Sequence, residues 1–375
     1  MAGGIDVDRA AVELAALLDR ASRDGHTLMP AAVARAALAG RGLDLDAALD
    51  VLGGESGEGT VARYGDGIGW RRLLAAEELI ATVVAGLVSR GRLFVVTGPQ
   101  GAVRDAVVRE RSGPRTVVVD DAQLLDVEAY AALFSSLEED EDVLLVGDLD
   151  MLPSPGPGQV LADLVAAPGV SWCDLVTTGP PISDEQAKPA TEEIPASLGE
   201  LAAAIRRGEL PPVDDPARHV VVVPVANADE GAHRVGQLVG TSIPRAFGIA
   251  PAEIQVLTPL RGGPGGVDAL CAVTEPCGAP PPLTVHAAAG RRWPAVVAVF
   301  PPDCAGVLSR ALVYTAVTRA TRHLSIVHGV GSALAYAVAR VPNRPRRTTL
   351  GDRLRVLLGG TVERMESADG TQALA

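Results

Sequence analysis

The segment TGPQGAVRD, residues 97–105, lies where a short apolar run gives way to a helical pattern, which is the position of a phosphate-binding loop. A working loop reads G-x-x-x-x-G-K-[ST]. Its glycines let backbone N–H groups close on phosphates, its lysine reaches the β- and γ-phosphates, and its hydroxyl holds Mg²⁺. Counted from Gly98, the positions of the second glycine, the lysine and the hydroxyl residue hold Val103, Arg104 and Asp105. The segment therefore lacks the groups that do this chemistry, and taken alone it reads as an ordinary strand–turn–helix.

Two adjacent acids, Asp120 and Asp121, end the apolar run TVVV. They resemble a Walker B pair, in which one carboxylate holds Mg²⁺ and the next positions a water molecule. Exposed acids at a strand end are common, so this motif is weak by itself. A more specific pattern follows in VLLVGDLDMLPSPGPG, residues 143–158, where an apolar run precedes G-D-x-D-x-L-P and a G-P-G turn.

Short apolar runs alternating with helical stretches position these motifs, and such alternation is typical of a parallel α/β sheet. Three runs come first, ending at Thr97, Val119 and Val146. A second set of runs lies at residues 219–225, 253–257, 283–285, 295–300 and 324–328. Helical spacing of apolar residues appears at residues 8–22, 30–38, 44–52 and 72–90.

The pattern predicts an α/β fold with two parallel-sheet lobes preceded by a small helical domain. Residues 177–197 are rich in Pro, Thr and acids, which is typical of a linker. The expected parts are a helical domain at 1–70, a first lobe at 72–180, a linker at 181–197, a second lobe at 198–355 and a tail at 356–375.

In their residues and in their order along the chain, these segments resemble RecD-like superfamily 1 DNA helicases of the exonuclease V alpha-subunit type, from about residue 72 to 355. The resemblance is strongest at GDLDMLPSPGPG, TPLRGGPGGV, TVHxxxGxxWPAVV and YTAVTRA. It implies two RecA-like lobes of the P-loop NTPase type. It also implies a vestigial nucleotide site made by Gly98, Gly101, Val103, Arg104, Asp148, Arg261 and Arg319.

The resemblance assigns individual roles as well. Asp120 matches the acid that holds Mg²⁺, and Asp121 replaces the usual glutamate beside it. Arg319 matches the arginine that contacts the γ-phosphate, and Arg261 matches another nucleotide-facing arginine. The simple alternative for both arginines is a surface or salt-bridge role. Met151 replaces the glutamine of the third motif.

The sequence also departs from the family pattern at several motifs. Three alanines, residues 287–289, replace polar residues that serve nucleotide and DNA contacts, and residues 172–183 lack the arginine of an F-R-Q-type triplet. Only short segments separate Asp105 from the run before Asp120, and Leu270 from Val285. The family places a strand-separating pin subdomain in the first gap and an SH3-like subdomain in the second.

These losses predict a catalytically inactive helicase homologue. Removing one preorganised donor typically costs about 10²–10³ in rate, and an arginine at a phosphoryl transition state is worth roughly 10³–10⁵. Arg104 stands at the position of the missing lysine and enters a helix, and we do not expect it to compensate. Asp120, Asp121 and Arg319 are then vestigial, and neither cofactor nor metal is expected, with ATP and Mg²⁺ bound only if nucleotide binding survives. A weak or partner-activated ATP-dependent helicase and a non-hydrolysing nucleotide sensor stay open as alternatives.

Composition narrows the partners. The net charge is −13, the pI is about 5.0, and Lys188 is the only lysine among 33 basic residues. Unaided DNA binding should therefore be weak, with Arg346 and Arg347 as the best phosphate contacts. The four cysteines show no metal-ligand spacing, and no apolar run is long enough to span a membrane. We expect a cytoplasmic protein whose partner is a nuclease, helicase or other DNA-processing factor.

Overall fold

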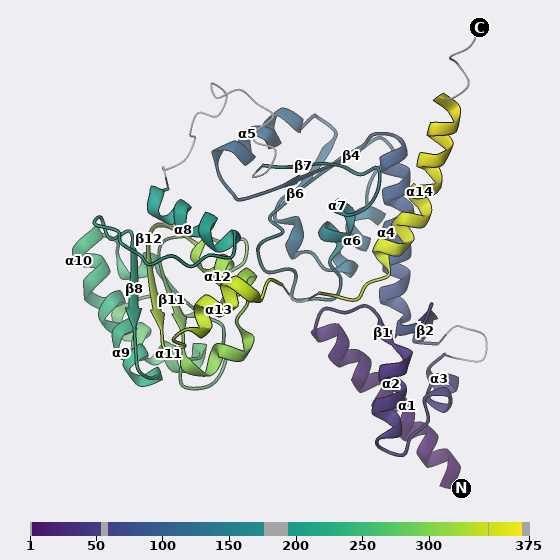
Figure 1. Cartoon of the computed structure of the whole chain (residues 1–375), viewed down its shortest axis with the longest axis horizontal. Coiled ribbons are helices and arrows are strands. Elements are labelled where there is room, and N and C mark those ends of the chain that lie inside the picture. The colour runs from purple at the N-terminus through teal and green to yellow at the C-terminus, as the bar shows by residue number, and fades with distance from the viewer. Residues whose placement is uncertain (1, 54–58, 176–193, 344, 370–375) are drawn as a thin grey trace. The chain divides into compact units, whose positions relative to one another are not determined.

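The computed structural model describes residues 2–53, 59–175, 194–343 and 345–369, and the chain divides into two compact units (Figure 1). Each unit has a parallel β-sheet with helices on its faces, which confirms the predicted α/β class with two parallel-sheet lobes. Unit 1 consists of Met1–Leu149, Pro153–Ala187 and Pro345–Ala375. Unit 2 consists of Asp150–Leu152 and Lys188–Arg344.

The N-terminal part of unit 1 packs three helices against a small sheet. The helices are α1 (Ala2–Arg23), α2 (Ala31–Ala39) and α3 (Leu45–Gly53). The antiparallel sheet has the order β1-β3-β2, with β1 (Met29–Pro30), β2 (Val61–Tyr64) and β3 (Gly67–Trp70). The predicted helical domain at 1–70 is thus helical only in part. Strands of two to four residues interrupted by glycine, as in GIGW, give no alternation from which to predict them.

The larger sheet of unit 1 has four parallel strands in the order β5-β6-β4-β7. Its runs LFVVT, TVVV and DVLLVG are rich in β-branched residues, and both faces are covered, so the strands read as unbroken apolar runs. The strands are β4 (Leu93–Thr97), β5 (Thr116–Val119), β6 (Asp142–Gly147) and β7 (Ser171–Asp174). The helices around them are α4 (Arg71–Ser89), α5 (Ala102–Arg111), η1 (Ala122–Leu124), α6 (Val127–Ser135) and α7 (Val160–Val165).

Unit 2 holds five parallel strands in the order β10-β9-β11-β12-β8, with a hydrophobic core on each face. The strands are β8 (Val220–Pro224), β9 (Ile254–Thr258), β10 (Leu283–Thr284), β11 (Trp293–Phe300) and β12 (Ala320–His328). The α-helices are α8 (Ala196–Arg206), α9 (Ala228–Gln237), α10 (Ile243–Phe247), α11 (Val267–Thr274), α12 (Arg310–Val317) and α13 (Ala333–Arg340). Short helical turns are η2 (Leu238–Ser242), η3 (Pro251–Glu253), η4 (Glu275–Cys277) and η5 (Pro302–Val307). No helix in the described ranges of either unit is long and apolar enough to cross a membrane.

The C-terminal segment belongs to unit 1, so the predicted second lobe at 198–355 extends too far. Helix α14 (Leu350–Asp369) packs on α4 and α7, and it buries Leu350, Leu354 and Leu358 in the core of the first sheet. The predicted tail at 356–375 is therefore mostly helix α14, and a single sequence does not show which lobe such a helix covers. The predicted linker lies outside the described residues up to 193, and its last residues begin α8.

A buried carboxyl group joins the three parts of unit 1. Glu77 of α4 is fully buried and accepts hydrogen bonds from Thr27 Oγ1 at 2.9 Å and from the backbone N and Oγ1 of Thr349 at 3.1 and 2.5 Å. Burial raises the pKa of Glu77 even though these hydrogen bonds oppose the shift. The α4 helix, the turn after α1 and the segment before α14 therefore depend on one acid whose ionisation is costly.

A second contact of the same kind uses Arg346. Its guanidinium donates to the carbonyl oxygens of Ser154, Gly156 and Gly158, at distances of 2.5–2.8 Å, and so fixes the G-P-G turn. Gly25, at φ +90°, passes so close that a Cβ atom there would lie 2.4 Å from Arg346 Nε. Arg346 thus holds backbone inside unit 1, whereas the neighbouring Arg347 is exposed.

We predict that Glu77→Gln becomes more stable relative to the wild type as pH rises. An acid whose pKa is raised on folding favours the folded state below its unfolded pKa, near 4.5, and loses that contribution as pH rises toward its folded value. Between those two pKa values the difference in unfolding free energy should grow by about 1.4 kcal/mol per pH unit. Urea unfolding from pH 4 to pH 8 measures it. Glu78→Gln, an exposed neighbour on the same helix, is the matched control, and a pH-independent difference for Glu77→Gln would contradict the assignment.

We also predict that substitutions of the two adjacent arginines affect different properties, stability for Arg346 and DNA binding for Arg347. Arg346→Ala leaves three carbonyl oxygens without their donor and should lower the free energy of unfolding by roughly 2–4 kcal/mol. Arg347→Ala should leave stability nearly unchanged and weaken only residual, salt-sensitive binding of single-stranded DNA. Urea unfolding and the fluorescence anisotropy of a labelled oligonucleotide separate the two effects. Equal stability of both variants would show that Arg346 does not hold the turn.

Candidate functional site

The loop between β4 and α5 lies where the sequence predicts a phosphate cradle. Gly98 has a φ of +140°, its N–H donates to Gly147 O at 2.9 Å, and a Cβ atom there would lie 3.0 Å from Leu175 Cβ. Helix α5 begins directly after Gly101, where Asp105 N bonds to Gly101 O. The strand–loop–helix geometry of a phosphate site is therefore retained, while Val103 brings an apolar side chain to the position of the second glycine.

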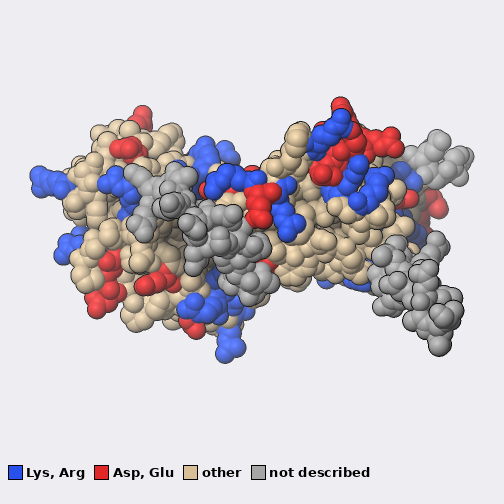
Figure 2. Space-filling view, turned by 90° about the horizontal axis from the view of Figure 1, so that it is seen from above, with Lys and Arg blue, Asp and Glu red and all other residues tan. Residues whose placement is uncertain are grey.

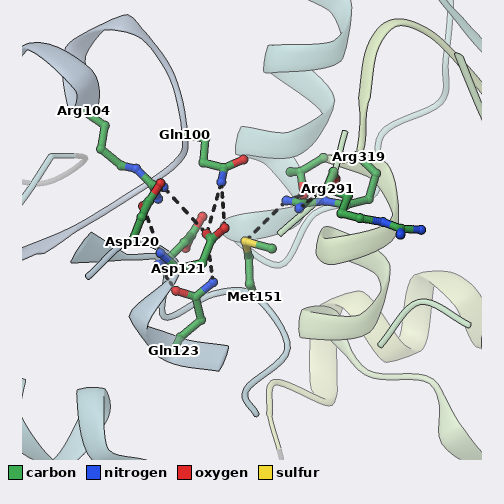
Figure 3. Close-up of polar contacts among 10 residues, drawn as sticks. Gln100, Arg104, Asp120, Asp121, Gln123, Met151, Arg291 and Arg319 are labelled. Atoms are coloured by element: carbon green, nitrogen blue, oxygen red, sulfur yellow. Dashed lines mark hydrogen bonds and ion pairs between the residues drawn. The ribbon is translucent and has the colours of Figure 1, made fainter. Parts of the chain in front are cut away.

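Arg104 fills the centre of this site. Its side chain is only 2% exposed, and Nη2 lies 2.5 Å from Asp120 Oδ1 and 3.7 Å from Asp121 Oδ1 (Figure 3). Both carboxylates at the end of β5 are thus paired with a guanidinium supplied by the first turn of α5. The expectation that Arg104 enters a helix holds, but the sequence did not show that its side chain reaches the acids.

Two glutamines complete the network around Asp121. Gln100 Nε2 donates to both carboxylate oxygens of Asp121, at 3.1 and 3.2 Å, and Gln123 Nε2 lies 3.4 Å from Asp121 Oδ1 (Figure 3). Gln123 Oε1 in turn accepts from the backbone N of the buried Asp148, at 3.1 Å. Sequence analysis missed both amides. Their nearness in sequence to the loop glycines and to the acid pair was the available signal.

The backbone at Asp121 is itself unusual. Its φ is +49°, a left-handed conformation that few residues other than glycine adopt and that aspartate tolerates better than most. Gly147, at the end of β6, leaves no room for a side chain, because a Cβ atom would lie 2.5 Å from Gln123 Oε1. The acid pair is therefore held in place by close packing as well as by its polar contacts.

The residues present do not fit a Mg²⁺ ion. Mg²⁺ requires several oxygen ligands in near-octahedral geometry, and here a fixed positive charge already lies against Asp120 and Asp121. A cation placed between the same carboxylates would be repelled by Arg104. Among the described residues, no group of three or more His, Cys, Asp or Glu side chains is placed to hold a metal ion.

The second predicted arginine, Arg319, lies in unit 2 and is fully buried. Its Nη1 donates to Arg291 O at 3.2 Å, and its Nη2 contacts Thr318 Oγ1 at 3.1 Å and Met151 Sδ at 3.5 Å (Figure 3). Met151, which stands where the family has glutamine, is thus part of the pocket that encloses Arg319. In this arrangement Arg319 acts as a packed core residue of unit 2.

The short segment Asp150–Leu152 is built into unit 2 by further contacts. Arg206 Nε donates to Asp150 Oδ2, and the backbone N of Leu152 donates to Thr315 Oγ1 at 2.8 Å. Met151 and Leu152 both lie in the hydrophobic core of unit 2. The third-motif residues after Leu149 therefore serve packing in unit 2.

The remaining predicted residues are dispersed. Arg261 is exposed in the loop after β9. Among the three alanines of the fifth motif, Ala288 is fully buried in the core, whereas Ala287 is exposed. Arg346 is engaged with the G-P-G turn, so its prediction as a phosphate contact stays a prediction. In unit 1 the structure brings together the loop, Arg104 and the acid pair, while Arg261 and Arg319 belong to unit 2.

Comparisons with known proteins agree with the motifs. Residues 283–327, which include Arg319, match a family model described as UvrD-like helicase C-terminal domain. The chain is 26% identical over 326 residues to the ATP-dependent RecD2 DNA helicase of Deinococcus radiodurans, a match that covers 69% of this chain and 42% of that helicase. The chain thus spans less than half the length of this curated relative.

Solved structures give weaker likeness. The arterivirus nonstructural protein 10 (helicase) aligns with a TM-score of 0.33 and 15% identity, over 74% of this chain and 70% of that one. The PRRSV helicase aligns with a TM-score of 0.31 and 13% identity, over 72% of this chain and 59% of that one. The two sequence matches confirm the resemblance drawn from the motifs. This chain is a relative of the RecD-like superfamily 1 helicases.

Proposed function

We propose that this chain is a non-hydrolysing homologue of RecD-like helicases that acts as a protein-binding or scaffold module in DNA repair or processing. The proposal rests above all on Arg104, whose buried guanidinium pairs with Asp120 and Asp121. These acids are the ones that, by resemblance, would hold Mg²⁺ and position water. The chain itself thus places a positive charge beside both acids, and on this proposal the loop needs neither a metal nor a nucleotide to be stable.

The missing groups make hydrolysis improbable on energetic grounds. Arg104, at the lysine position, pairs its guanidinium with Asp120 and Asp121, and Asp105 supplies no hydroxyl for Mg²⁺. Losing a single such donor costs about 10²–10³ in rate, and an arginine acting on the transition state is worth roughly 10³–10⁵. Arg319, at the position of that arginine, is enclosed by Met151 and Thr318.

The binding role is supported by what the chain keeps. Both units retain complete parallel sheets with well-packed cores. Selection for a folded body without the chemistry favours use as a surface on which another protein docks. By resemblance, the partner is a nuclease, a helicase or another DNA-processing factor. With a net charge of −13, contact with DNA is weak or passes through that partner.

We predict that the purified chain hydrolyses no ATP above the level of its Asp120→Ala variant, with or without single-stranded DNA. We also predict that Mg–ATP does not raise its melting temperature, because Arg104 occupies the acid pair. The triple variant V103G/R104K/D105T restores the order G-K-T at the motif spacing and should gain a Mg²⁺-dependent rise in melting temperature from ATP.

Each alternative has its own signature in these assays. DNA-stimulated turnover of the wild type that Asp120→Ala abolishes would establish the competing reading, an ATP-dependent helicase-type enzyme. A Mg–ATP shift of the wild type without turnover would establish a nucleotide sensor. Circular dichroism of the triple variant checks that it is folded before its response is interpreted.

A further inference from the structure

We infer that the free edge of strand β8, together with the cavity beside it, binds an extended, largely apolar segment of a partner protein that carries a basic residue. This inference deepens the proposed binding role by naming a surface and the chemistry of its partner. It lies wholly within unit 2, so its test is independent of the nucleotide assays on unit 1.

The outward backbone groups of β8 are the first observation. β8 pairs only with β12, through His219 O with Leu324 N at 2.7 Å and Val225 N with His328 O at 3.0 Å. Alternate residues of a strand direct N–H and C=O to opposite sides. Val222 therefore presents its N–H and C=O away from the sheet, and within the described chain neither has a partner.

The flanking residues limit pairing to one short register. Asp215 Oδ2 accepts from Val220 N at 2.9 Å, which takes up the outward N–H on one side of Val222. Pro224, on the other side, has no N–H. An added strand would thus form two hydrogen bonds at Val222, flanked by the outward carbonyl groups of its neighbours. Such edge pairing is how extended peptides are recognised on open sheets.

A cavity of about 500 Å³ runs along this edge and is lined by residues 220–222. Its apolar wall comes from Leu238, Ile243 and Phe247 on the helical segment that follows α9. The side chain of Val222 is 38% exposed, a large value for a strand valine. Alternate side chains of an added strand would therefore face an apolar recess.

The helix beside the cavity is irregular where it lines it. The turn η2 (Leu238–Ser242) is π-helical, and both of its end residues face the cavity. π-helical turns are rare and occur frequently at binding sites. Arg218, also in the lining, has a φ of +57° that is unusual for a residue other than glycine.

The floor of the cavity is neutral. His323 stacks on Phe247 at 4.4 Å, and its Nδ1 and Nε2 bond to Arg218 O and Ser325 Oγ at 2.9 and 2.8 Å. Burial lowers the pKa of His323 to about 4, so the ring is uncharged near pH 7 and packs as an aromatic surface. An apolar side chain is thus the natural occupant of this recess.

Charges at the mouth define the rest of the partner. Asp214 and Asp215 lie against the single cation Arg218, so the lining carries a net negative charge. A lysine or arginine beside the apolar residues would complement it. A second copy of this chain would instead bring the acids of two mouths together, on a protein whose net charge is already −13. The chemistry therefore favours a different, basic partner.

A displayed library of random peptides, panned on the full-length chain, tests the proposal. Enriched peptides should alternate apolar residues and contain a lysine or arginine. Val222→Pro removes the outward N–H and none of the hydrogen bonds to β12, and it should weaken their binding by at least about tenfold, whereas Val222→Thr, which keeps the N–H, should not. Ala246→Trp places an indole in the cavity from an exposed position and should also abolish binding. Ala335→Trp, exposed on α13 outside the cavity, is its matched control.

Several results would overturn the proposal. These are no enrichment above that on the Ala246→Trp variant, enriched peptides that bind Val222→Pro as well as the wild type, or enriched peptides that are acidic. Sedimentation of the chain alone covers the remaining occupant. A dimer that Val222→Pro dissociates would show that the edge pairs with a second copy and would refute the partner named here. Melting curves of each variant confirm that any loss of binding is not a loss of fold.

Discussion

The ion pair between Arg104 and the two acids at the end of β5 is the constraint on which the account of unit 1 depends. A parallel sheet delivers a glycine loop and two carboxylates to the same edge, and carboxylates this close must have a counter-charge. In a P-loop NTPase Mg²⁺ provides that charge and the nucleotide comes with it. Here the guanidinium of Arg104 comes from the chain itself, and it lies in one polar network with Asp120, Asp121 and Gln100.

In unit 2, a residue predicted to face the nucleotide is buried. An arginine that acts on a phosphate must reach solvent or ligand, yet Arg319 is fully buried and contacts Met151, Thr318 and the carbonyl of Arg291. Replacing the family's glutamine with Met151 supplies a polarizable thioether that packs against this side chain. Ala288 likewise fills core space where the family has a polar contact. Met151 and Ala288, at two positions where this sequence departs from the family pattern, are thus both buried in the core of unit 2.

The sequence predicted the lobes well because their strands are unbroken apolar runs, and all five runs of unit 2 became strands of one sheet. It did not predict β1, β2 and β3, which are too short to show alternation, or β7, in which Trp172 is half-exposed at a sheet edge. Residue identity alone led to the prediction that the catalytic groups are missing, and this stays a prediction. The sequence did not predict that Arg104 pairs with Asp120, because the pairing joins residues on different elements whose distance depends on the order of the strands. For the same reason, the contacts of Arg346 with the G-P-G turn and the burial of Arg319 could not be predicted from their motifs.

Arg104 provides a counter-charge for the acid pair, and a double-mutant cycle measures the strength of its interaction with Asp120 directly. The unfolding free energies of the wild type, Arg104→Met, Asp120→Asn and the double variant give the coupling between the two side chains. This role of Arg104 predicts a favourable coupling free energy of roughly 0.5–3 kcal/mol between Arg104 and Asp120. It also predicts that the stability of the wild type does not change when millimolar MgCl₂ is added. A coupling near zero, or a wild type that Mg²⁺ stabilises through Asp120, would contradict it.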